Sequence, residues 1–175
     1  MSLNPCHSFS HTFLSSPRGE QDGLAARSVF KDENCGVWLG TAGNVTPLHY
    51  DLCHGFLVQV LGTKTVTYFE PDDYRNLYQR KEHPELSQVD LDAWRREAAN
   101  TAPGDRDSGG LRPHEKWPRF ADATPRTVTL EPGDCLYTPP FWWHHVATSE
   151  LAPALSVLVP FDMSPDEPVH PAHFM

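Results

Sequence analysis

The sequence contains no long apolar run. No stretch approaches the roughly 20 consecutive apolar residues that a helix needs to span a bilayer, so we predict no membrane-spanning helix. Residues 1–14 are polar and lack the basic segment followed by an apolar stretch that marks a secretory signal. We therefore expect an intracellular protein, cytoplasmic or nuclear, that makes no membrane contact.

Cysteine is scarce and scattered. The four cysteines, Cys6, Cys35, Cys53 and Cys135, form no C-x-x-C pair. A disulfide framework or a structural zinc site needs closely spaced or paired cysteines, so we predict neither and expect reduced thiols. Cys53 is expected to act as a small apolar side chain near the candidate site.

Positive charge is also in short supply. Fourteen Lys and Arg stand against 23 Asp and Glu, which gives a formal net charge of −9. Broad binding to a phosphate backbone needs clustered basic residues, and no such cluster occurs, so general nucleic-acid binding is disfavoured. This charge is compatible with a basic protein or peptide as partner, although most acidic surfaces serve only solubility. An RNA substrate stays open, and nothing in the sequence sets the oligomeric state.

Turn-forming residues are abundant, which disfavours long helices. With 17 prolines and 11 glycines in 175 residues, the chain is typical of short strands joined by turns. We predict an all-β-dominated fold, an antiparallel barrel or jelly roll, over residues 36–161. The expected flanking parts are an irregular lead-in (1–35), a helix-and-loop insertion (72–126) and a loose, Pro-rich tail (162–175).

Apolar alternation and turn signals place the individual elements. Strands are predicted at 37–39, 49–61 (a strand pair or one bent strand), 64–69, 126–130, 135–138, 142–148 and 154–161. Leu61-Gly62-Thr63 predicts a tight turn that pairs its two flanking strands as a hairpin. Residues 131–134 form a second turn signal, with Pro132 second and Gly133 third. A short helix within 90–99 would be capped by Asp90 or Asp92, and residues 117–120 would dock the insertion on the barrel.

The pattern His49-Tyr50-Asp51 is the first half of a candidate metal site. Alternation along a strand places His49 and Asp51 on one face, about 7 Å apart at Cα, which is close enough to share an ion. Two histidines and one carboxylate suit non-haem Fe(II), whereas structural zinc prefers tetrahedral N/S ligation. The alternative for the pair alone is an ordinary His–Asp hydrogen bond.

The second half of the site lies near the end of the predicted barrel. Gly133-Asp134 is followed after four residues by Pro139, and His144 comes after four more, which is the spacing of a second cupin motif. Side-chain alternation allows only one of His144 and His145 to face the interior. The spacing to Pro139 favours His144, so we predict His49, Asp51 and His144 as the metal ligands.

Several linked stretches in order resemble the JmjC family, in particular its small hydroxylase branch that includes factor inhibiting HIF. They span most of residues 36–161 and are 43–51 (GNVTPLHYD), 56–64 (FLVQVLGTK), 88–90 (QVD), 117–120 (WPRF), 130–139 (LEPGDCLYTP) and 142–146 (WWHHV). The resemblance implies a double-stranded β-helix that holds Fe(II) on His49, Asp51 and His144.

The resemblance also implies co-substrates and their contacts. The family uses 2-oxoglutarate and dioxygen, and Thr46 and Lys64 match the residues that hold the distal carboxylate of 2-oxoglutarate. The Lys64 ammonium opens a strand and can pair with a dicarboxylic acid. The chain departs from the family pattern at Gly55, Leu158 and Pro160, where the branch often carries polar or aromatic side chains.

The function that follows is an Fe(II)- and 2-oxoglutarate-dependent oxygenase, a hydroxylase or demethylase acting on a protein or RNA side group. No catalytic side chain is assigned beyond the metal ligands. The alternative is a catalytically silent JmjC-like module that binds a protein partner and keeps the three ligands. A general cupin metalloenzyme fits less well, because the additional His and Glu ligands of such enzymes have no match after Asp51.

Overall fold

Eight strands form the framework of the part of the chain that the structure describes. The computed structural model describes residues 35–99 and 110–174. The strands are β1 (Gly36–Gly40), β2 (Val45–His49), β3 (His54–Leu61), β4 (Lys64–Phe69), β5 (Arg126–Leu130), β6 (Cys135–Thr138), β7 (Trp143–Thr148) and β8 (Ala154–Phe161). The helical segments are η2 (Pro71–Arg75), α1 (Leu91–Ala98), α2 (Pro113–Lys116), η3 (Pro118–Asp122) and η4 (Pro171–Phe174). No helix in these ranges is long and apolar enough to cross a membrane.

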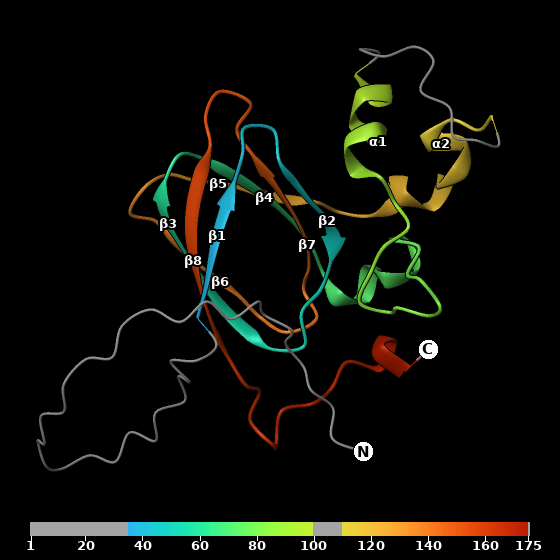
Figure 1. The fold of residues 1–175 in the computed structure, drawn as a ribbon. Helices are drawn as coiled ribbons and strands as arrows, with labels where there is room; N and C mark the ends of the chain where they lie inside the picture. The colour runs from blue at the N-terminus through green and yellow to red at the C-terminus, as the bar shows by residue number, and fades with distance from the viewer. Residues whose placement is uncertain (1–34, 100–109, 175) are drawn as a thin grey trace, which may run out of the picture.

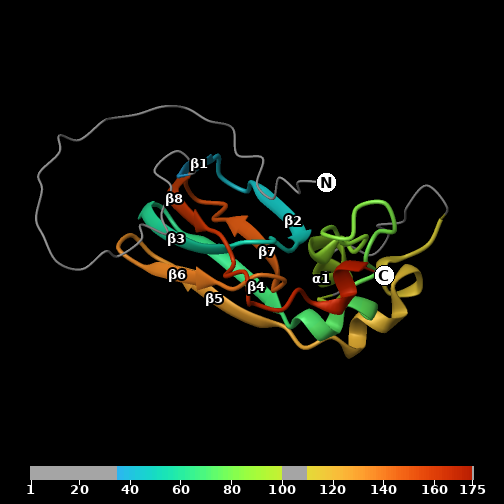
Figure 2. The ribbon, with the colours of Figure 1, turned by 90° about the horizontal axis from the view of Figure 1, so that it is seen from below.

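The strands form two antiparallel four-stranded sheets, as a jelly roll requires. One sheet has the order β1-β8-β3-β6 and the other β2-β7-β4-β5 (Figure 1). Seen from below, the sheets face each other and the helical segments gather beyond one end (Figure 2). The buried residues Val66, Tyr68 and Leu130 of the second sheet pack with Leu57 and Leu136 of the first. The predicted all-β jelly-roll fold is confirmed.

The predicted hairpin around Gly62 is wrong. β3 pairs with β6 and β8, whereas β4 pairs with β5 and β7, so the turn carries the chain from one sheet to the other. Alternation and a glycine turn are common to hairpins and to sheet-switching corners, so the sequence could not separate them. The second turn is as predicted, because Asp134 N–H donates to the Glu131 carbonyl at 3.0 Å and Gly133 has a φ of +101°.

Two glycines at these corners provide a matched stability test. Gly62 has a φ of +67°, and a Cβ there would lie 2.3 Å from the backbone oxygen of Pro153. A Cβ at Gly133 would meet nothing within 4 Å, so only backbone strain opposes it. We expect Gly62→Ala to lower the free energy of unfolding by roughly 2 kcal/mol or more, and Gly133→Ala by about 1 kcal/mol. Urea unfolding measures both, and equal losses would contradict the close approach at Gly62.

The insertion packs on the outer face of the second sheet. Helix α1 begins after Asp90, whose carboxylate accepts a hydrogen bond from Ala93 N–H at 2.8 Å, as predicted for an N-cap. One buried apolar cluster joins the insertion to the second sheet. It contains Leu48, Phe69 and Trp143 from the sheet and Leu77, Val89, Leu91 and Trp94 from the insertion. Trp117 and Phe120 are buried in this cluster, so the predicted docking segment is confirmed. Residues 100–109 lie outside the described residues.

The C-terminal tail differs from the prediction of a loose segment. Its prolines exclude a long regular helix, but η4 forms, and side-chain contacts attach the tail to the barrel. The His54 ring contacts Glu167, the Tyr50 hydroxyl contacts His173, and Asp72 contacts His170. Proline spacing predicts backbone regularity and carries no information about such contacts. The predicted lead-in, residues 1–34 in particular, lies outside the described residues.

Candidate metal centre

A bulge in β2 brings Thr46 and His49 to the same cavity. Thr46 pairs with Val146 and His49 with His144, so two residues of β2 between these pairs oppose one residue of β7. The irregularity falls at Pro47, which lacks the N–H that a regular ladder needs. Strict alternation would place positions 46 and 49 on opposite faces, and the bulge restores them to one face. The alternation of residues along this strand does not predict the bulge.

Three potential ligand atoms converge from β2, the following loop and β7. The donor atoms of His49, Asp51 and His144 all lie within 4.8 Å of one another. Nε2 of His49 lies 4.0 Å from an Asp51 carboxylate oxygen, and Nε2 of His144 lies 3.7 Å from the other. These separations exceed hydrogen-bond length, so the simple His–Asp hydrogen bond does not account for the arrangement.

The second nitrogen of each histidine fixes its tautomer. Nδ1–H of His49 donates to the Pro47 carbonyl at 2.8 Å, and Nδ1–H of His144 donates to the Trp142 carbonyl at 2.9 Å. A carbonyl oxygen only accepts, so Nδ1 carries the proton in each neutral ring, and Nε2 then presents its lone pair toward the shared centre. Burial, followed by the neighbouring His49, lowers the pKa of His144 to about 4, which keeps its imidazole neutral at pH 7. Neutral imidazoles oriented by backbone carbonyls are what a divalent metal requires, so this donor set fits Fe(II).

His145 faces away from this centre. Its Nε2 lies 3.1 Å from a carboxylate oxygen of Asp92 on α1, and the residue is buried. Burial lowers the pKa of His145. Because side chains alternate along β7, His144 faces the cavity and His145 contacts the insertion.

Asp51 lies beyond the end of β2, not within a strand as predicted. Its backbone carbonyl accepts a hydrogen bond from Phe141 N–H at 2.9 Å, which ties the first half of the site to the loop before His144. Phe141 has a φ of +65°, an uncommon conformation for a bulky residue and one that is concentrated at functional sites. The carboxylate of Asp51 accepts no hydrogen bond from the described residues and is 39% exposed.

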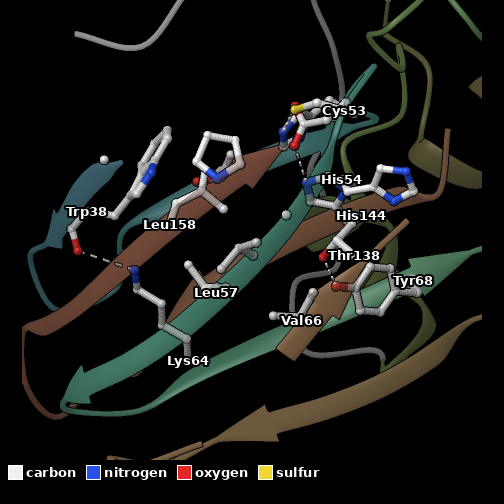
Figure 3. A pocket seen from close by; sticks show the side chains of 17 residues that line it. Trp38, Cys53, His54, Leu57, Lys64, Val66, Tyr68, Thr138, His144 and Leu158 are labelled. Carbon is white, nitrogen blue, oxygen red and sulfur yellow. Dashed lines mark hydrogen bonds and ion pairs between the residues drawn. The ribbon is translucent and has the colours of Figure 1, made fainter. Parts of the chain in front are cut away.

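The three ligands and Lys64 line one cavity of about 260 Å³ between the sheets. In Figure 3, His144 lies at one end and Lys64 near the other, with Leu57 and Val66 between them. Thr46, the other predicted co-substrate contact, also lines this cavity. Every predicted site residue thus reaches the same space.

Lys64 is a buried cation that lacks a carboxylate partner among the described residues. Its side chain is 6% exposed, and Nζ lies 3.5 Å from the carbonyl oxygen of Trp38, a long contact (Figure 3). Burial lowers the pKa of Lys64. A buried ammonium is costly unless it is paired, so this end of the cavity is suited to an anionic ligand.

Sequence reasoning missed three polar side chains of the cavity wall. The hydroxyls of Tyr68 and Thr138 form a hydrogen bond, and the buried His54 lines the same cavity. Tyr68 could have been found, because it shares the alternation of Lys64 and Val66 on β4. Gly55 faces Leu158, whose Cδ1 would lie 3.2 Å from a Cβ at position 55. The cavity wall is therefore apolar at these positions, where the small hydroxylase branch often has polar groups.

The fold and this cavity define the class of protein to which the chain belongs. Two antiparallel sheets enclosing two histidines and an aspartate make a cupin-type barrel with a candidate metal centre. A family model described as a cupin-like domain matches residues 6–167, so the chain belongs to the cupin-like domain family.

The chain is similar to curated proteins, some of which are named for the JmjC domain. Jumonji C domain-containing protein 5 of Drosophila melanogaster is 39% identical over 121 residues, 69% of this chain and 26% of that protein. Lysine-specific demethylase 8 of Xenopus tropicalis is 31% identical over 120 residues, 69% of this chain and 24% of that protein. tRNA wybutosine-synthesizing protein 5 of Gallus gallus is 32% identical over 130 residues, 74% of this chain and 32% of that protein. The chain thus matches about a quarter to a third of each relative, and its fold is that of a cupin-like JmjC domain.

Proposed function

We propose that this chain is an Fe(II)- and 2-oxoglutarate-dependent oxygenase that hydroxylates, or demethylates through hydroxylation, a side group of a protein or RNA. The observation that carries the proposal is one cavity with two complementary ends. His49, Asp51 and His144 form a metal-ligand set at one end, and the buried Lys64 ammonium offers a partner for a carboxylate at the other. The resemblance to the small hydroxylase branch makes hydroxylation our first choice.

Different residues would bind the iron and the co-substrate. His49, Asp51 and His144 would hold the iron, and Lys64 with Thr46 would hold the distal carboxylate of 2-oxoglutarate. Bound iron with 2-oxoglutarate and dioxygen supplies the oxidising chemistry, which belongs to the cofactor. The carbonyls of Pro47 and Trp142 orient both imidazoles, so the protein contributes a preset ligand geometry.

The cavity wall protects this chemistry from water. Leu57, Val66 and Leu158 line the space between the two ends and offer no hydrogen bonds to solvent. Asp51 is the ligand nearest to solvent, with 39% of its side chain exposed. We infer that the prime substrate approaches on the side of Asp51, while the co-substrate occupies the buried side toward Lys64.

The names of relatives and the charge of the chain bear on the class of the prime substrate. One relative is named a lysine-specific demethylase and another a tRNA wybutosine-synthesizing protein, so both protein and RNA substrates occur by name among similar chains. The net charge of −9 favours a basic protein or peptide over RNA.

Succinate formation tests the proposal directly. Purified protein is incubated with Fe(II), 2-oxoglutarate and oxygen, and succinate is measured before and after metal removal with a chelator. We expect succinate that disappears on chelation and returns when Fe(II) is added back. Succinate that is unaffected by chelation would contradict a metal-dependent reaction.

The second candidate is a silent JmjC-like module that binds a protein partner. The apolar wall formed by Gly55, Leu158 and Pro160 favours it, because fewer polar groups remain to hold a co-substrate. Calorimetric titration of 2-oxoglutarate with and without Mn(II) separates the two candidates. Metal-dependent micromolar binding supports the oxygenase, whereas metal binding without any 2-oxoglutarate binding supports the silent module.

A further inference from the structure

We propose that the C-terminal tail is a strap that positions the metal-ligand loop. The strap is residues 162–173. The ligand loop is residues 49–54, from the last residue of β2 to the first residue of β3. The strap contacts the loop at Tyr50 and at His54, one on each side of Asp51. The proposal rests on the proposed metal site and assigns Glu167 and His173 as positioning residues.

Glu167 makes the first contact. Its carboxylate accepts a hydrogen bond from Nε2–H of His54 at 2.9 Å, and Tyr137 contacts the other ring nitrogen at 2.7 Å. The His54 ring stacks on Phe161 with centroids 4.7 Å apart and planes 8° apart. The same carboxylate accepts from Ser164 N–H at 3.1 Å, which closes a turn in the strap. Glu167 thus joins the fold of the strap to the end of the ligand loop.

His173 makes the second contact, at the other side of Asp51. Its Nδ1 lies 3.0 Å from the hydroxyl of Tyr50, the residue between the two ligands His49 and Asp51. Tyr50 is 3% exposed and packs edge-on against Trp143, with ring centroids 4.7 Å apart. Burial, followed by the charge of Glu85, raises the pKa of Tyr50 to about 12, so its hydroxyl keeps its proton.

Asp51 needs this support more than the two histidines do. Each histidine ring is oriented by its own backbone hydrogen bond, whereas the Asp51 carboxylate accepts none from the described residues. Its position therefore depends on the backbone of the loop. Groups hydrogen-bonded to metal ligands change metal affinity by about 10- to 100-fold when removed. The strap acts one step further away, through the backbone of the loop, so we expect an effect at the lower end of that range.

Matched variants of neighbouring acidic residues test the strap. Glu167→Ala removes the contact with His54, Glu167→Gln keeps an acceptor oxygen, and Asp166→Ala removes an exposed carboxylate one residue away. The double variant Glu167→Ala/His173→Ala removes both contacts. Three readouts apply to each protein: the Kd for Co(II), amide hydrogen exchange of the ligand loop without metal, and thermal unfolding.

We expect Glu167→Ala to weaken Co(II) binding about tenfold, the double variant further, and Glu167→Gln to recover most of the loss. Exchange in residues 49–54 should rise in the same order while β4 and β7 stay protected, and Asp166→Ala should match the wild type. Unchanged Co(II) affinity and loop exchange in the double variant would overturn the strap. If the wild type binds no metal, the proposed function fails, and loop exchange in the metal-free protein alone decides on the strap.

Discussion

His144→Ala is expected to abolish metal binding, whereas His145→Ala is expected to preserve it. The two residues are neighbours on β7, but only His144 directs a nitrogen at the carboxylate of Asp51. Loss of one of three protein ligands should weaken Mn(II) or Co(II) binding at least 100-fold, which corresponds to about 2.7 kcal/mol. His49→Ala should behave like His144→Ala. Metal titration followed by electron paramagnetic resonance or absorbance measures the effect, and succinate formation should disappear with the metal.

His145→Ala should instead cost stability. His145 is 2% exposed and contacts Asp92 at 3.1 Å, so its removal leaves a cavity between β7 and α1. A loss of roughly 2 kcal/mol in the free energy of unfolding is expected, with metal affinity kept. If the folded His145→Ala protein lost metal binding, or if His144→Ala retained it, the proposed ligand set would be wrong.

Local signals in the sequence predicted most of the secondary structure. Strand 154–161 and the corner at Gly133 occur as expected, because alternation and turn chemistry act over a few residues. The helix cap at Asp90 follows from the same kind of local rule. The choice between His144 and His145 also reduces to the alternation of one strand, and the structure directs His144 to the cavity.

Pairing between distant segments could not be predicted in the same way. The sequence around Gly62 fits a hairpin and a sheet-switching corner equally well. The close packing of Gly62 against Pro153 and Ala154, which distinguishes the two, is not visible in the sequence. The bulge at Pro47 changes which residues of β2 face the cavity, but a proline in a strand does not say where the partner strand shifts. The contacts of the tail with the rest of the chain join residues 98 to 123 positions apart, such as His54 with Glu167, and leave no local pattern.

Lys64→Met is expected to have opposite effects on co-substrate binding and on stability. The variant keeps the length of the side chain and removes the ammonium. If Lys64 pairs with a carboxylate of 2-oxoglutarate, the loss should cost about 2–5 kcal/mol, or at least 30-fold in the Kd for 2-oxoglutarate. Co(II) affinity should stay unchanged because the ligands lie at the other end of the cavity. Lys81→Met, at an exposed position, is the matched control.

The protein without ligand should become more stable in the same variant. Among the described residues, the buried Lys64 ammonium has one carbonyl contact, at 3.5 Å, so its charge opposes folding. We expect a gain of about 1 kcal/mol at pH 7. Burial lowers the pKa of Lys64 below its ordinary 10.5, so the unfolded chain binds more protons between these two values. The stability of the wild type therefore rises with pH in that window relative to Lys64→Met, and the advantage of the variant should shrink toward pH 10.5. Urea unfolding at a series of pH values measures the difference. A variant that is less stable at pH 7 and binds 2-oxoglutarate normally would show that Lys64 is a structural residue.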